Sequence, residues 1–299
     1  MKASDINTIA VIGAGQMGGG IAQVAAGKGY TVLLSDASVE RAQTGKDKIA
    51  KILRKQVDKG RMKAEERDAL LERIHPIGAD LAGVEKADLV VEAATEDREL
   101  KIDIFKNADS KMKPDAILAS NTSSISITRL AGQTSRPGKV IGMHFMNPVP
   151  LMKLVEIVNG VQTDPETTDT IRELSEKLGK TVITSKDQPG FVVNRMLIPF
   201  LNEACFALQE GLGTPEDIDQ GAKLGLNHPM GPLELADLIG LDTLLFIAEV
   251  LHREFGDDKY RPATLLRNLV AAGWYGRKVG RGFYVYDDRG QKTGRAFER

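Results

Sequence analysis

The sequence predicts an α/β fold in which a doubly wound, mostly parallel sheet is followed by a second, all-helical domain. Short apolar runs alternate with helical patterns through residues 1–186, as in a parallel sheet that helices cover on both faces. From residue 187 onward the apolar spacing is helical, which predicts a domain of helices. The chain has 299 residues, enough for two domains.

The strands of the first domain are predicted from short runs of β-branched and other apolar residues. They cover residues 8–12, 31–34, 88–93, 116–119, 140–145, 154–158 and 181–184. N-caps, an N1 proline or a closing glycine predict helices between them, over 17–28, 97–109 and 165–178. A helical hairpin is expected as an insertion at about 39–74.

The second domain is expected to span residues 187–299. Ile198, Leu201, Cys205 and Leu208 are spaced as on one face of a helix. Thr214 followed by Pro215 is typical of a helix start, with an N-cap and an N1 proline. Residues 241–255 have the pattern of a long amphipathic helix.

The composition excludes several classes of protein. Lysine and arginine total 40 against 41 aspartates and glutamates, so the formal net charge is −1. This balance provides no overall field to attract nucleic acid or an anionic membrane, and neither is expected as a partner. The uncharged residues 7–27 are too rich in glycine to predict a membrane span or a targeting segment. A single cysteine, Cys205, fits the reducing cytoplasm.

A glycine-rich stretch, Gly13-Ala-Gly15-Gln-Met-Gly18, directly follows the first predicted strand and precedes a helix. In such a G-x-G-x-x-G pattern the first glycine makes a tight turn and the second lets the backbone approach a pyrophosphate. The third allows the helix to pack closely on the strand. The helix N-terminus presents free N–H groups to the phosphates. The pattern therefore predicts a Rossmann-type dinucleotide site.

Asp36 lies at the end of the second predicted strand, where a carboxylate would bind a ribose 2′-hydroxyl. The alternative is a glycine-rich turn with an incidental aspartate. The ordered succession of strand, motif, helix, strand and acid argues against that alternative. The acid also favours NAD over NADP, because a 2′-phosphate would meet a like charge.

Polar residues that can perform chemistry follow two later strands, at 120–124 and at 144–147. In an open α/β sheet, ligands bind outside the carboxyl ends of the strands. A histidine such as His144 can take a proton there, and a serine such as Ser123 can hold a carbonyl or hydroxyl oxygen. Glu156, in the next predicted strand, could accept a hydrogen bond from the imidazole. Both His144 and Glu156 could instead be structural, and the residues alone leave this open.

Six segments together resemble the L-3-hydroxyacyl-CoA dehydrogenase family in its short, stand-alone form. They are residues 11–18, 119–124, 142–150, 187–195, 228–242 and 280–284. They occur in the family's order and span nearly the whole chain. The resemblance implies an NAD cofactor, an acyl-CoA substrate, and a homodimer formed through the second domain.

The resemblance also implies a role for individual residues. His144 would be the acid/base with Glu156 as its partner carboxylate, and Ser123 and Asn194 would flank the reacting oxygen. The expected nucleotide contacts are Gly13, Gly15, Gln16, Met17, Gly18, Asp36, Glu96, Lys101, Ser123, Asn147 and Lys278. The expected contacts with the coenzyme A substrate are Lys55, Lys59, Ser123 and Asn194. One departure is Val279, where the family often has threonine.

A strongly basic stretch at residues 46–63 is a candidate for contact with the substrate. Lys48, Lys51, Lys55 and Lys59 are spaced as on one helix face. A charged face of this kind is most often a solvated surface. The alternative, which the resemblance favours, is an arm that attracts the phosphates of coenzyme A, with Lys59 as the main contact and Lys55 as a weaker one.

These observations lead to one expected function and two alternatives. The expected function is reversible, NAD-linked oxidation of an (S)-3-hydroxyacyl-CoA, with 3-hydroxybutyryl-CoA as the expected substrate, to the 3-oxoacyl-CoA. A relative on the same scaffold could instead oxidise a free hydroxy acid of the gulonate or carnitine type. A non-catalytic nucleotide-binding or sensor protein is the third possibility. No metal site is expected, because the four histidines show no ligand spacing.

Overall fold

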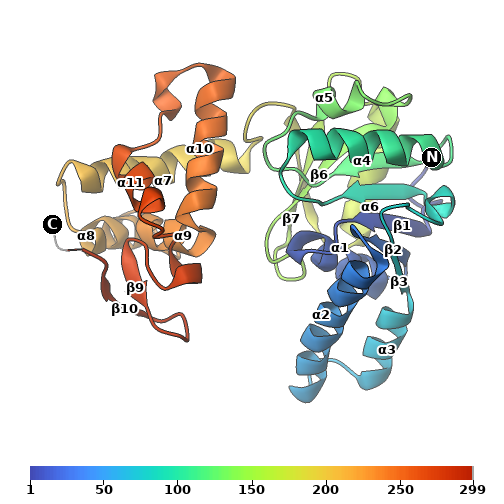
Figure 1. Cartoon of the computed structure of the whole chain (residues 1–299), viewed down its shortest axis with the longest axis horizontal. Helices are drawn as coiled ribbons and strands as arrows, with labels where there is room; N and C mark the ends of the chain where they lie inside the picture. The colour runs from blue at the N-terminus through green and yellow to red at the C-terminus, as the bar shows by residue number, and fades with distance from the viewer. Residues whose placement is uncertain (298–299) are drawn as a thin grey trace. The chain divides into compact units, whose positions relative to one another are not determined.

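The structure, a computed structural model, describes residues 1–297. The chain divides into two compact units, Met1–Phe191 and Val192–Arg299, coloured blue to yellow-green and yellow to red (Figure 1). The division comes a few residues after the boundary expected at 187. The carboxylate of Asp187 explains the difference, since it accepts hydrogen bonds from the Ser126 hydroxyl and from the N–H groups of Ile127 and Thr128. These bonds hold Asp187 in the first unit.

The first unit is built on an eight-stranded sheet with the order β3-β2-β1-β4-β5-β6-β7-β8. The strands are β1 (Thr8–Ile12), β2 (Thr31–Ser35), β3 (Ile74–Ile77), β4 (Leu89–Glu92), β5 (Ile117–Ser120), β6 (Val140–Phe145), β7 (Leu154–Asn159) and β8 (Thr181–Lys186). All neighbouring pairs are parallel except β6 and β7. The predicted doubly wound, mostly parallel sheet is confirmed.

The sequence did not predict β3, which begins at the last residue of the range expected for the hairpin. This strand is short and contains Pro76, which has no N–H to give to a ladder. It pairs with β2 at the edge of the sheet, where a proline is tolerated. The four residues Ile-His-Pro-Ile are too few, and too interrupted by the proline, to give an alternating pattern from which a strand could be predicted.

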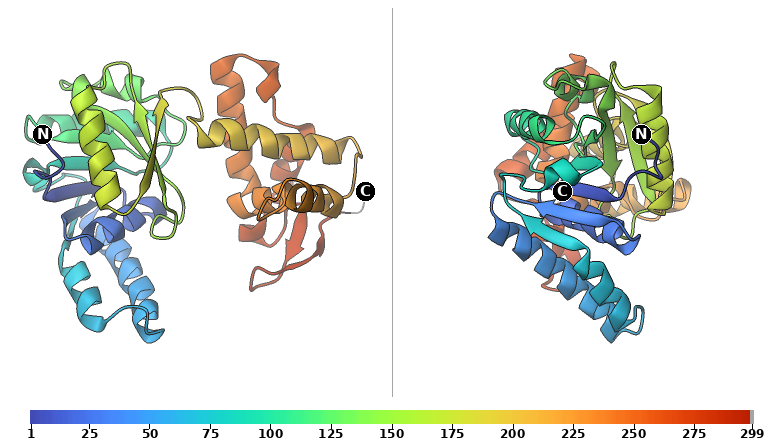
Figure 2. Two further views of the ribbon diagram at one scale, coloured as in Figure 1. Left: turned by 180° about the vertical axis from the view of Figure 1, so that it is seen from behind. Right: turned by 90° about the vertical axis from the view of Figure 1, so that its right-hand side faces the viewer.

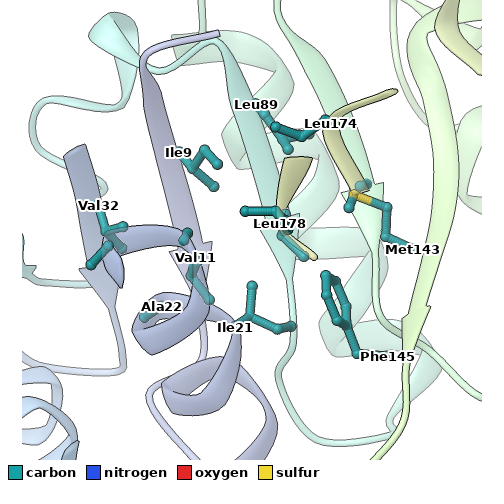
Figure 3. Close-up of a cluster of buried hydrophobic side chains, with 14 of the residues drawn as sticks. Ile9, Val11, Ile21, Ala22, Val32, Leu89, Met143, Phe145, Leu174 and Leu178 are labelled. Carbon is teal, nitrogen blue, oxygen red and sulfur yellow. The ribbon is translucent and has the colours of Figure 1, made fainter. Parts of the chain in front are cut away.

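Helices cover both faces of the sheet. They are α1 (Gln16–Gly27), α2 (Val39–Asp58), α3 (Ala64–Glu72), α4 (Arg98–Lys111), α5 (Ile127–Ala131) and α6 (Pro165–Lys177). Ile9 and Val11 of β1 belong to the core under α1 and α6, and the alternate residues Ala10 and Ile12 belong to the core under α4 and α5. Figure 3 shows the first of these cores, where Ile21 from α1 meets the sheet.

The helical hairpin of α2 and α3 extends away from the sheet beside β3 (Figure 1, Figure 2). Helix α2 packs on the rest of the first unit through its buried residues Ala42, Gly45, Ile49 and Leu53. Gly45 lies against Ala14, where a β-carbon would come within 2.6 Å of the Ala14 side chain. At the far end of the hairpin, residues 58–61 are exposed, which leaves that end available to a ligand.

The second unit contains α7 (Val193–Gln209), α8 (Pro215–Gln220), α9 (Pro232–Ile239), α10 (Leu241–Phe255) and α11 (Thr264–Ala271). Ile198, Leu201, Cys205 and Leu208 are all buried on α7, as their spacing predicts. The helical second domain is confirmed with one correction, because it is not all-helical. Strands β9 (Tyr284–Tyr286) and β10 (Lys292–Arg295) form a short antiparallel sheet.

A buried aspartate attaches β9 to the helices. Asp237 on α9 is fully buried and accepts hydrogen bonds from the N–H groups of Phe283 and Tyr284 and from the Tyr286 hydroxyl, at 2.9–3.0 Å. A β-carbon on Gly282 would lie 1.9 Å from the Asp237 carboxylate. The Asp237 carboxylate therefore requires a glycine at position 282, just before β9. No helix within residues 1–297 is long and apolar enough to cross a membrane.

Candidate active site

The glycine motif forms the turn between β1 and α1, and two of its glycines are required by the fold. Gly13 has φ 103°, a left-handed conformation that favours glycine. A β-carbon there would lie 2.6 Å from the carbonyl oxygen of Ala93. A β-carbon on Gly18 would lie 1.7 Å from the carbonyl oxygen of Gly13. These two positions bring helix α1 against the strand, as the motif predicts.

Gly15 differs from both, because nothing in the protein requires a glycine there. Its φ of −70° is open to any residue, and a β-carbon would meet no atom within 4 Å. It is the exposed N-cap of α1 and provides no side-chain cap. The first N–H groups of α1 are thus left for an outside partner, which is the arrangement that binds phosphate at a helix N-terminus.

A cavity of about 540 Å³ opens beside this turn. Its walls come from the residues after β1, β2 and β4, including Gly13, Gly15, Gln16, Met17, Asp36 and Ala93. The sheet order reverses between β1 and β4, so the cavity lies where an open α/β sheet binds its ligand. The volume is in the range of small-molecule and cofactor sites.

Asp36 stands in the wall of this cavity with its carboxylate held in place. One oxygen, Oδ2, accepts the N–H of Ala14 at 2.9 Å, and Oδ1 accepts the N–H of Ala37 and the Nε–H of Arg41. Partial burial alone would raise the pKa of this carboxyl, but the two backbone bonds and the Arg41 guanidinium lower it below its usual value. Asp36 is therefore ionised at neutral pH and can accept a ribose hydroxyl.

His144 and Glu156 are directly opposite each other across β6 and β7. The antiparallel pairing turns a spacing of twelve residues into a side-by-side pair, with Nδ1 of the imidazole 2.7 Å from Oε2 of the carboxylate. His144 is 7% exposed and Glu156 is fully buried. The Phe191 ring packs against the imidazole in a T-shaped arrangement, at a centroid distance of 5.7 Å and an interplanar angle of 63°.

This geometry determines which imidazole nitrogen can react. A carboxylate accepts, so Nδ1 carries the proton that bonds Glu156, and Nε2 holds the free lone pair. An imidazole fixed in this way can accept a proton at Nε2, while the carboxylate stabilises the imidazolium that forms. The pair has the geometry of a general base, the imidazole, that a carboxylate holds in one orientation.

Ser123 lies in the loop after β5, and Glu96 reaches it from the loop before α4. The carboxylate of Glu96 accepts the N–H groups of Ser123 and Ser124 at 2.9 and 3.0 Å. Lys101 has an exposed fraction of 1%, and its ammonium lies 2.7 Å from Glu92. Lys101 therefore has almost no surface that a nucleotide could touch, and the expected direct contact stays a prediction.

The other expected site residues lie on separate elements. Asn147 is exposed just after β6, and Lys55 and Lys59 are exposed at the end of α2. In the second unit, Asn194 is in the first turn of α7. Lys278 pairs with both carboxylate oxygens of Asp242 at 2.6–2.7 Å. The roles of these residues in binding stay predictions.

Sequence reasoning missed three residues that shape the site. Arg41 pairs with Asp36, Glu92 pairs with Lys101, and the side-chain oxygen of Asn121 accepts the N–H of Phe145 beside His144. Glu92 did carry a signal, because it is a lone acid in an otherwise apolar strand. Arg41 and Asn121 lie in polar stretches where nothing distinguishes them. No group of three or more potential metal ligands occurs in the part of the chain that the structure describes.

Comparison with known families accounts for nearly the whole chain. Residues 8–188 match the 3-hydroxyacyl-CoA dehydrogenase NAD binding domain, and residues 190–286 match the C-terminal domain of the same family. The chain is 55% identical to a probable 3-hydroxybutyryl-CoA dehydrogenase of Deinococcus radiodurans, over 92% of this chain and 99% of that protein. It is 51% identical to a probable enzyme of the same name in Bacillus subtilis, over 95% and 99%.

A solved structure agrees with these matches. The crystal structure of (S)-3-hydroxybutyryl-CoA dehydrogenase from Ralstonia eutropha superposes with a TM-score of 0.90 at 50% identity, covering 95% of this chain and all of that one. The predicted family, its oxidoreductase class and its NAD cofactor are thereby confirmed. The chain belongs to the 3-hydroxyacyl-CoA dehydrogenase family, whose NAD-binding members are oxidoreductases that act on CH–OH groups.

Proposed function

We propose that the chain interconverts (S)-3-hydroxybutyryl-CoA and acetoacetyl-CoA, with NAD as cofactor and His144–Glu156 as its acid–base pair. The observation that carries the proposal is the 2.7 Å bond between the imidazole and the buried carboxylate, at the carboxyl end of β6. The relatives' names point to the same substrate.

The pair supplies the proton transfer. In oxidation, Nε2 of His144 takes the proton of the 3-hydroxyl group while the C3–H bond breaks. Glu156 stabilises the resulting imidazolium, and in reduction the same imidazolium returns the proton to the 3-oxo oxygen. The hydroxyl of Ser123 and the amide of Asn194 stabilise negative charge on the reacting oxygen. Bound NAD would accept the hydride from C3 in oxidation.

The protein's own residues fit this cofactor. Gly15 leaves the backbone open at the start of α1, and the cavity reaches from there to the carboxylate of Asp36. NAD is favoured over NADP, because Asp36 is ionised and would repel a 2′-phosphate. Arg41 tempers this repulsion, so the preference is one of degree.

Coenzyme A is proposed to bind along the hairpin. Lys55 is in the last turn of α2 and Lys59 is its C-cap, and both are exposed on the far half of the hairpin. Their ammonium groups can meet the diphosphate and 3′-phosphate of the substrate. A homodimer through the second unit is proposed as well, and exposed apolar side chains there, such as Leu224 and Leu226, would be covered in it. A cytoplasmic location is proposed, consistent with the single buried thiol of Cys205.

Oxidation of NADH by the purified protein tests the proposal directly. Acetoacetyl-CoA should support the reaction. Two truncated substrates, free acetoacetate and the thioester of acetoacetate with pantetheine, should support it poorly. Equal activity with the free acid would favour the hydroxy-acid alternative. NADH binding without turnover of acetoacetyl-CoA, other 3-oxoacyl-CoA thioesters or free oxo acids would favour the nucleotide-binding or sensor alternative.

A further inference from the structure

A buried cluster of charges lies beneath the loop that carries Ser123. The ammonium of Lys101, 1% exposed, is 2.7 Å from Oε1 of Glu92, 3.2 Å from the carbonyl oxygen of Ala94 and 3.4 Å from Oε2 of Glu96. Glu92 is fully buried at the end of β4. Two carboxylates thus share one ammonium; Glu92 and Lys101 have almost no access to water, and the Glu96 side chain is 25% exposed.

Glu92 ties two strand ends together. Besides Lys101, its carboxylate accepts the N–H of Ala94 and the hydroxyl of Ser120, both at 2.7 Å. Ala94 follows β4 and Ser120 ends β5, the strand that leads into Ser123. Glu92 therefore fixes the point from which the Ser123 loop departs.

Glu96 holds the loop itself. Its Oε1 accepts the backbone N–H groups of Ser123 and Ser124 and the hydroxyls of Thr122 and Ser124, at 2.5–3.0 Å. Burial would raise the pKa of this carboxyl, but the charge of Lys101 and these hydrogen bonds lower it below its usual value. Glu96 is therefore ionised, and its Oε1 accepts the hydrogen bonds that residues 122–124 of the loop donate.

The bond to the Ser123 hydroxyl is the weak one in this set. Ser123 Oγ lies 3.3 Å from Oε1 of Glu96, while its backbone N–H is held at 2.9 Å. The backbone is fixed and the hydroxyl is free to turn toward another acceptor. Neither Glu96 nor Lys101 is among the residues that line the nucleotide cavity.

A contribution to the stability of the fold is not a sufficient explanation for this cluster of charges. Removing Glu92 and Lys101 from water, and Glu96 in large part, is unfavourable, and well-packed apolar side chains of similar size often serve a fold better. Within the cluster, Glu96 accepts hydrogen bonds from three consecutive loop residues, 122–124, and Glu92 accepts one from Ser120 just before them. The arrangement fits a demand for precise placement of the loop.

We propose that Glu96, held in turn by Lys101 and Glu92, is a positioning residue that places the Ser123 hydroxyl for the chemical step. This assignment rests on the proposed function of Ser123 at the reacting oxygen. It adds to the direct nucleotide contact expected at Glu96, which stays a prediction, and it gives Glu92 a role that the sequence did not assign.

The test is a comparison of kcat and KM in Glu96→Gln. Glutamine presents an amide NH2 either to the ammonium of Lys101 or to the N–H donors of the loop, so one contact is lost in either orientation. Displacement of the hydroxyl should lower kcat by about 10–100-fold, whereas loss of a nucleotide contact alone would raise the KM for NADH at constant kcat. Glu99→Gln, at an exposed acid on the same helix α4, is the matched control and should leave both unchanged.

Action through Ser123 requires that the effects are not additive. In a Ser123→Ala background, Glu96→Gln should lower kcat little further, because the hydroxyl that it positions is gone. A purely structural role would reduce kcat by the same factor in both backgrounds, and that result would overturn the proposal.

A second variant guards against a folding defect. Ser124→Ala removes one donor to Glu96 and leaves the buried charges intact, and it should lower kcat in the same direction by a smaller factor. If parent enzyme turns over acetoacetyl-CoA but Glu96→Gln raises the KM for NADH at constant kcat, this inference fails alone. If the parent does not turn over acetoacetyl-CoA, the proposed function fails first.

Discussion

At the scale of single residues, the pairing of His144 with Glu156 makes the strongest prediction. General acid–base catalysis contributes about 10²–10⁴-fold, so His144→Gln should lower kcat by that order. Glu156→Gln keeps the shape of the side chain and removes the charge that stabilises the imidazolium. If the two residues act as a unit, the double variant should be little worse than His144→Gln alone.

Steady-state reduction of acetoacetyl-CoA by the two single variants and the double variant measures this coupling. NADH binding, followed by fluorescence, should persist in all three, since the histidine acts on the substrate. Losses that multiply fully would mean that Glu156 is structural and that His144 works without it.

Asp36 makes a second prediction, about the cofactor. The proposed ribose contact would serve ground state and transition state alike, so Asp36→Ala should raise the KM for NADH and leave kcat nearly unchanged. Discrimination against NADPH should relax, because the carboxylate that repels a 2′-phosphate is gone and Arg41 is released from its ion pair. Kinetics with both cofactors check this, and a parent enzyme that already prefers NADPH would contradict it.

The contribution of sequence reasoning differs between residues. Asp36 and the glycines could be predicted because their chemistry depends on short spacings after a strand. The cluster under Ser123 could not, because Glu92, Glu96 and Lys101 meet only when β4, the next loop and α4 have folded together. A lysine at a helix position that becomes fully buried has no sequence pattern of its own.

At the scale of elements, the far end of α2 makes a third prediction. Replacing Lys55 and Lys59 together by glutamine should weaken acetoacetyl-CoA binding and leave NADH binding unchanged. Both side chains are exposed, so we expect no more than about 1 kcal/mol from each. The difference from the parent should shrink as ionic strength rises.

A matched control is present on the same helix. Lys48 and Lys51 are also exposed, nearer the start of α2. Their double replacement changes the net charge by the same amount and should have a smaller effect on KM for acetoacetyl-CoA. Equal losses for both pairs would indicate general attraction by the basic helix, and equal losses for NADH would indicate a damaged hairpin.

Most elements could be predicted, because their apolar residues recur with the spacing of a strand or of a helix. The short helices α5, α9 and α11 were not predicted individually, and the three strands that were missed have physical reasons. Strand β3 is short and interrupted by Pro76, and β9 and β10 depend on the buried carboxylate of Asp237, which lies far away in the sequence. When a distant side chain holds an element in place, the sequence of the element itself does not predict it.

At the scale of the whole molecule, Asp237 makes stability depend on pH. Burial raises its pKa to about 6 against the hydrogen bonds of Phe283, Tyr284 and Tyr286, and the nearby charge of Asp219 adds to the rise. A raised pKa means that the folded protein binds the proton more tightly than the unfolded chain. The contribution to stability is therefore full below about pH 4 and lost as the pH rises through 6, on the order of 2–3 kcal/mol.

Calorimetric unfolding of the full chain and of Asp237→Asn checks the sign. The asparagine does not titrate and also loses part of the hydrogen bonding, so the variant should be less stable throughout. The gap in Tm between parent and variant should be wider at pH 5 than at pH 7, because the parent loses its proton over that interval. A gap that stays constant or widens toward pH 7 would contradict the expectation.

The freedom of space around Gly15 has a consequence for how such a sequence changes over generations. An alanine at this position would meet no atom of the protein and would lose only the modest preference of an N-cap for glycine. Selection for a stable fold therefore maintains Gly13 and Gly18, and only selection for nucleotide binding maintains Gly15. A duplicated gene copy released from catalysis would be free to lose this glycine early and still encode a folded protein. The residue at position 15 thus records whether a descendant of this chain still depends on its cofactor.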